Sequence, residues 1–118
     1  MIRRDQPTCF PSDVVAAVSS RDDGTVLDRT LENWHDESVV NSRRKFCASV
    51  GVDYDQCVYQ IIEYGSEETY DRIVQVSGPS AAGVSADVLY TETPGLGLFL
   101  PIADCVGTII YDPSRRAL

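Results

Sequence analysis

Two apolar runs near the C-terminus constrain the fold of this chain most strongly. Residues 97–100 read GLFL and residues 106–111 read VGTIIY, and neither run contains a charged side chain. Short apolar runs without polar alternation are typical of strands that are buried on both faces of a sheet. Such strands need hydrogen-bonded neighbours on both edges. The sequence therefore predicts that both runs are central strands of a β-sheet.

The remaining pattern predicts further strands and one helix. Residues 36–50 form the helical stretch, since Asp36 suits the N-cap, apolar residues recur on one face, and Gly51 suits the position after the C-cap. We therefore expect an α+β fold, a mixed β-sheet with packed helices. Further strands are expected at residues 14–18, 57–64, 72–76 and 87–91, with loops or turns at 19–24, 67–71, 77–85 and 112–114.

The chain is expected to contain an arm and one domain. Residues 1–12 are mixed in character and contain two prolines, which indicates a loosely held N-terminal arm. Residues 13–118 are expected to form a partial domain that is truncated at its C-terminus, because few residues follow the second apolar run to supply its neighbours. Unpaired apolar strands of this kind predict poor solubility or self-association on expression.

Charge and composition exclude several partners. The formal net charge of −8 and a pI of about 4.4 argue against a protein that follows the phosphates of nucleic acid. No apolar run reaches the roughly 18 residues that a membrane span needs. The N-terminus lacks the apolar stretch of a secretory signal. We therefore expect no nucleic-acid partner, no membrane and a cytoplasmic location with reduced thiols.

The pair Asp104-Cys105 lies between the two apolar runs and is the main candidate for chemistry. A cysteine there is a small hydrophobe, a nucleophile or a soft metal ligand. The adjacent carboxylate disfavours a free thiolate, whereas a metal cation would offset the repulsion. The four cysteines form no CxxC pair, and His35 is the one histidine in the chain.

Three sequence blocks then carry a resemblance to a known family. Residues 86–91 (ADVLYT), 94–100 (PGLGLFL) and 103–113, which contain the ADC triplet and end in a DP turn, resemble the central signature of the laccase-domain family. That family is also labelled multicopper polyphenol oxidase and is better described as zinc-dependent purine nucleoside phosphorylase. Residues 19–24 and 36–44 are similar to its TTR-x-GG turn and its D-x-x-x-V-x-x-N-R helix. The resemblance implies the N-terminal half of a layered α/β/β/α fold.

The resemblance also implies a metal site with three protein ligands. Cys105 matches the cysteine of the ADC triplet. A histidine is expected in the strand that here reads QIIEYG, but Ile62 stands at its position, with Glu63 and Tyr64 as candidate replacements. The third ligand, a histidine downstream of the DP turn, would lie beyond Leu118. The chain thus holds one of three expected ligands, and zinc is implied rather than the copper of the family name.

Finally, the resemblance implies an activity and leaves an alternative open. The family activity is phosphorolysis of purine nucleosides, with adenosine deamination as a second activity. Whether this chain is an enzyme stays open: the alternative is an inactive truncated or split half, acting only through association with a missing C-terminal half or with itself. Four residues are candidates for the substrate site or its rim: Arg21, Arg43, Asp87 and Asp104. Three of them have a structural alternative, which is an exposed turn residue for Arg21, a buried bridge for Arg43 and a loop cap for Asp87.

Overall fold

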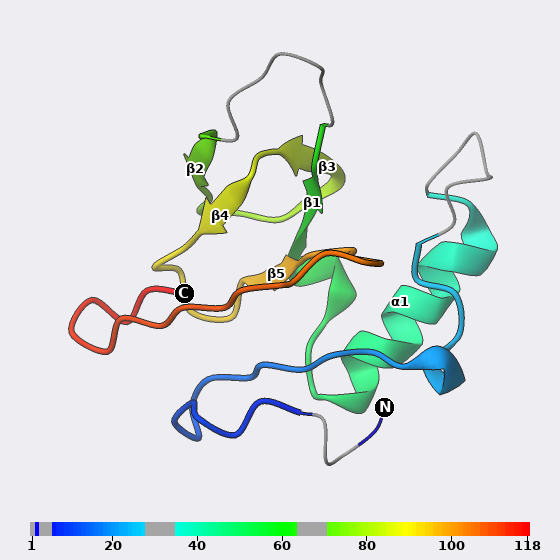
Figure 1. Ribbon diagram of the computed structural model, residues 1–118, viewed down its shortest axis with the longest axis horizontal. Helices are drawn as coiled ribbons and strands as arrows, with labels where there is room; N and C mark the ends of the chain where they lie inside the picture. Colours follow the sequence, from blue (N-terminus) through cyan, green and yellow to red (C-terminus); the bar gives the residue numbers. More distant parts are fainter. Residues whose placement is uncertain (1, 3–5, 28–34, 64–70) are drawn as a thin grey trace. The chain divides into compact units, whose positions relative to one another are not determined.

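The computed structural model describes residues 2, 6–27, 35–63 and 71–118 (Figure 1). These residues form one α-helix, two 3-10 helices and five short strands, and every strand ladder is parallel. The predicted α+β class is therefore confirmed. Two compact units make up the chain, Met1–Tyr54 and Asp55–Leu118. The expected boundary between residues 12 and 13, and the packing of the helix on the sheet, stay predictions.

The first unit is built around α1 (Glu37–Ser49), which confirms the predicted helix. The carboxylate of Asp36 accepts hydrogen bonds from the backbone N–H and the hydroxyl of Ser38, which satisfies part of the open helix N-terminus. Gly51 follows the C-cap with φ of 76°, a left-handed conformation that glycine adopts without strain. The buried face of the helix holds Val39, Arg43, Phe46 and Cys47.

Residues 14–18 are not the buried strand that the sequence predicts. They carry no strand hydrogen bonds in the described part of the chain, and Val15 and Val18 are 52% and 44% exposed. The side chain of Gln6 accepts a hydrogen bond from the Val18 N–H at 2.7 Å and donates one to the Val18 carbonyl at 3.0 Å. A side chain from the predicted arm therefore takes the place of a neighbouring strand. The turn at 19–24 becomes a 3-10 helix, η2 (Arg21–Asp23).

The second unit is organised around β1 (Cys57–Ile61), which follows η3 (Tyr54–Gln56). β1 lies between β3 (Ser80–Ser85) and β5 (Gly97–Phe99) in a three-stranded parallel sheet. A second parallel sheet pairs β2 (Ile73–Gln75) with β4 (Val88–Tyr90). The strands expected at 57–64, 72–76, 87–91 and 97–100 are thus confirmed in shortened form, while the turn expected at 67–71 falls mostly outside the described residues.

β3 corrects the prediction of a loop over residues 77–85. Its sequence, SAAGVS, has no strong strand propensity, so the pairing with β1 decides its conformation. Gly83 has φ of 95°, and a Cβ atom there would lie 2.7 Å from Cδ1 of Ile61. Small residues therefore let β3 approach β1 closely, which composition alone did not indicate.

The core of the second unit lies where the two sheets meet. Val58 of β1 packs against Val76, Ala86 and Leu89, and it is fully buried. The buried amide of Gln60 donates hydrogen bonds of 3.0 Å to the carbonyls of Ala86 and Asp87, which holds the chain between β3 and β4 in place. Four partly buried residues complete the cluster: Val74, Val84, Leu96 and Leu98.

Residues 106–111 are not the central strand that the sequence predicts. We call residues 102–110 the exposed segment, because each of them is exposed; Val106 reaches 92% and Ile110 75%. β5 pairs with β1 and not with residues 106–111. Leu118 at the chain end pairs with Thr91 through two backbone hydrogen bonds. No described strand pairs with the exposed segment. The turn at 112–114 is confirmed, since Asp112 accepts a hydrogen bond from the Ser114 N–H at 2.8 Å.

Candidate functional site

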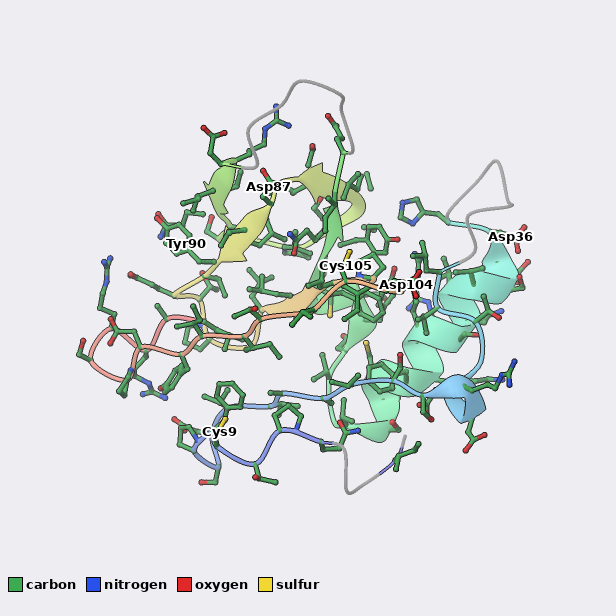
Figure 2. The ribbon with its side chains drawn as sticks, in the orientation of Figure 1. Cys9, Asp36, Asp87, Tyr90, Asp104 and Cys105 are labelled. Atoms are coloured by element: carbon green, nitrogen blue, oxygen red, sulfur yellow. The ribbon has the colours of Figure 1, made fainter. Side chains whose placement is uncertain are left out.

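Asp104 and Cys105 lie on the exposed segment, in a bend that follows β5 (Figure 2). The sequence led us to expect a cysteine inside an apolar frame at the end of a central strand. Both residues are instead exposed, so the thiol is accessible from solvent. This exposure disagrees with the core-hydrophobe alternative for Cys105. Its role as a metal ligand stays a prediction.

Asp87 occupies the connection between β3 and β4 and is half-buried (Figure 2). Its carboxylate accepts a 2.9 Å hydrogen bond from the backbone N–H of Arg72, just before β2. The guanidinium of Arg72 donates to the hydroxyl of Ser85 at 2.9 Å. These contacts tie β2 to the end of β3, which agrees with the loop-capping alternative for Asp87. Its assignment to a site rim stays a prediction.

Arg43 is fully buried in the first unit. Its Nε donates to the carbonyl of Val26 at 2.8 Å, and a terminal nitrogen lies 3.2 Å from the hydroxyl of Tyr54. The same nitrogen lies 3.3 Å from Nδ1 of His35, and in that contact the imidazole nitrogen accepts because a guanidinium only donates. The arginine therefore bridges the helix to a loop and to η3, which agrees with the buried-bridge alternative.

Arg21 is exposed at the start of η2. The carboxylate of Asp23 accepts a 2.7 Å hydrogen bond from the N–H of Ser20, which fixes the shape of the turn. Arg21 belongs to the first unit, with Arg43, whereas Asp87, Asp104 and Cys105 belong to the second. The role of Arg21 at a substrate site stays a prediction.

The residues present do not by themselves fit a catalytic zinc ion. Such a site needs three protein ligands and an open position. In the described ranges no three histidine, cysteine, aspartate or glutamate side chains gather in a way that could hold a metal. Ile62 is half-buried and Glu63 is exposed, while Tyr64 lies outside the described residues. We therefore derive no chemical step through a metal held by this chain alone.

The residues present do not fit a group of copper ions either. Copper centres in proteins rely on imidazole and thiolate ligands. The chain has a single histidine, and His35 is engaged with Arg43 in the first unit. Cys47 and Cys57 are buried and Cys9 is exposed, and no disulfide joins any of the four cysteines, all of which lie in the described part.

Sequence reasoning overlooked Gln60, which holds the connection on which Asp87 lies. A polar side chain in the apolar run of β1 was the available signal. A buried amide is costly unless it is hydrogen-bonded, so its presence there predicts a partner. Its two bonds to backbone carbonyls supply that partner and position the connection.

The chain was also compared with known families and proteins. The chain combines an α+β fold with an exposed Asp-Cys pair that follows a parallel strand. Residues 27–118 match the family model described as multi-copper polyphenol oxidoreductase laccase. The chain belongs to this family. No significant match was found among curated proteins or among solved structures. Within the described residues, no helix is both long and apolar enough to span a membrane.

Proposed function

We propose that this chain contributes the thiolate of Cys105 to a zinc-dependent site for phosphorolysis of purine nucleosides. We further propose that the chain does not complete that site alone. In such a reaction a phosphate oxygen bonds to C1′ of the ribose while the bond from C1′ to the purine nitrogen breaks. The base leaves with the electron pair of that bond.

One observation supports the proposal above the others. Cys105 is exposed on a segment that pairs with no described strand, within the matched range 27–118 and in the ADC triplet that carries the resemblance. A thiolate and a carboxylate are both negatively charged donors, so an accessible pair of them is suited to bind a cation. The absence of a three-ligand group among the described residues supports the second part, namely that further ligands come from elsewhere.

Of the two candidate arginines in the first unit, Arg21 is the better suited to bind a phosphate. Its guanidinium is exposed on a turn whose backbone is held by the carboxylate of Asp23. A planar, permanently charged guanidinium suits bidentate contact with phosphate. Arg43 is less suited, because it is fully buried and already donates to Val26 and Tyr54.

The test is a zinc titration of the purified chain by calorimetry, with two matched cysteine variants. Cys9 and Cys105 are the two exposed cysteines, so Cys9→Ser is the control for Cys105→Ser. We expect weak zinc binding that Cys105→Ser removes and Cys9→Ser retains. Inosine and inorganic phosphate, assayed in parallel, should give no hypoxanthine with the chain alone.

Two results would contradict the proposal. Equal zinc binding by both variants would show that Cys105 is not the ligand. Tight binding of about one zinc per chain, together with release of hypoxanthine, would show that this chain completes the site without outside residues. A second candidate, a non-catalytic half that acts only by association, is favoured by the apolar surface of the exposed segment and predicts no zinc binding in any variant.

A further inference from the structure

Arg72 directly precedes β2 and is exposed, yet its backbone is firmly held. Its N–H donates to the Asp87 carboxylate at 2.9 Å, and its carbonyl accepts from the N–H groups of Asp87 and Val88 at 2.9 and 3.1 Å. The buried amide of Gln60 in turn fixes this connection through the carbonyls of Ala86 and Asp87. An exposed guanidinium therefore extends from a fixed point of the backbone.

The side chain of Arg72 is also oriented, but most of its donors are open. Its Nη1 donates to Oγ of Ser85 at 2.9 Å, which uses one of the five N–H groups of a guanidinium. Toward the residues that the structure describes, the guanidinium makes no further hydrogen bond and no ion pair. The Ser85 hydroxyl accepts from Arg72, so its own hydrogen is left to donate. Charged and neutral donors therefore lie side by side at the surface.

This pair of side chains lies at the carboxyl ends of parallel strands. Ser85 is the last residue of β3 and lies beside Ile61, the last residue of β1. The chain then passes through residues 86 and 87 from the first sheet to the second. In open α/β sheets, ligands bind outside the carboxyl ends of the strands, where the topology changes. The place of Arg72 and Ser85 in the fold therefore favours a ligand site.

We propose that Arg72 and Ser85 bind a phosphate group, either as inorganic phosphate or as a phosphate monoester. The fork of a guanidinium matches two phosphate oxygens, and a third oxygen is left to accept from the neighbouring hydroxyl. Binding is weak, because the Asp87 carboxylate and the net charge of −8 oppose an anion. The proposal does not rest on the proposed function, since it needs neither zinc nor Cys105.

A titration of the full chain, followed by amide NMR at constant ionic strength and without zinc, tests the site. Saturable shifts are expected at the amides of residues 72 and 85–88 with inorganic phosphate, with glycerol 3-phosphate, or with both, which identifies the source of the phosphate group. Arg72→Gln should weaken binding at least about tenfold, because the charged donors are lost. Ser85→Ala should weaken it by about two- to tenfold, because one neutral donor is lost.

Arg115→Gln is the matched control. Arg115 is also an exposed arginine of the second unit, but its guanidinium is paired with Glu92 at 2.6 Å, so this variant should bind phosphate as the unsubstituted chain does. Equal binding by Arg72→Gln and Arg115→Gln, or shifts that do not saturate with either ligand, would overturn the proposal. The amide spectra show whether each variant keeps its fold, and Ser85→Ala decides alone if Arg72→Gln does not. Neither zinc nor nucleoside is present, so failure here leaves the zinc proposal untouched.

Discussion

β1 and the exposed segment are both apolar stretches of the second unit, yet they have opposite environments. Val58 of β1 is fully buried, whereas Val106 is 92% exposed. β1 has a parallel neighbour on each edge, β3 and β5, while the described residues give the exposed segment none. An apolar sequence therefore specifies the capacity to form a buried strand, and the available neighbours decide whether it does so.

The same substitution in the two regions should have very different effects. Val58→Ala removes two buried methyl groups next to Val76 and Leu89 and should lower the free energy of unfolding by about 2–3 kcal/mol. Val106→Ala removes the same atoms from a solvated site and should change it by less than about 0.5 kcal/mol. Urea denaturation of both variants at low protein concentration measures the difference. Similar losses would mean that Val106 is buried in solution.

Two glycines extend the comparison to the backbone. Gly83→Ala places a methyl group against Ile61 at a φ of 95° and should cost about 1–2 kcal/mol in the free energy of unfolding. Gly107→Ala meets only the end of the Ile102 side chain, at 3.0 Å, and that flexible end can move aside. Its effect should stay below about 0.5 kcal/mol in the same urea measurement. A larger loss for Gly107→Ala would show that the exposed segment is rigidly packed.

The smallest expected effect is a pH dependence at Asp112, which follows the exposed segment. The hydroxyl and the N–H of Ser114 lower the pKa of Asp112 below its ordinary value of 3.8. Because the folded pKa is depressed, this stabilisation is present above the ordinary value and is lost as the pH falls through the folded pKa.

Asp112→Asn retains an acceptor for Ser114 but cannot titrate. When the pH is lowered through 3.8, the free energy of unfolding of Asp112→Asn should therefore fall less than that of the unsubstituted protein. Urea denaturation across that pH range measures the difference. Ser38 lowers the pKa of Asp36 in the same way at the start of α1, so Asp36→Asn gives the corresponding effect in the first unit. An unchanged acid profile in both variants would contradict the role of these caps.

Local signals were sufficient for part of the fold. The helix was predicted nearly to its ends because Asp36 and Gly51 mark its boundaries through hydrogen bonding and backbone conformation. β3 was missed because its small residues carry little propensity, and its close approach to β1 depends on Gly83. Residues 14–18 were misassigned because the side chain of Gln6 takes the place of a neighbouring strand.

The candidate site was predicted less completely. Cys105 was singled out by its neighbours in sequence and by the resemblance, but its exposure depends on the missing strand neighbours, which no local pattern reveals. The sequence left two roles open for Arg43, a site rim or a buried bridge. Its hydrogen bonds to Val26 and Tyr54 favour the buried bridge. Such bonds join residues far apart in the chain, so only the folded arrangement reveals them.

Amide hydrogen exchange of the dilute chain tests the central claim most directly. That claim is that residues 106–110 pair with no strand of the described part of the chain, while β1 has a strand neighbour on each edge. The account predicts that amides of residues 106–110 exchange at nearly the rate of an unfolded peptide, while those of residues 57–61 are strongly protected. Protection of residues 106–110 equal to that of β1 in the monomer would contradict it.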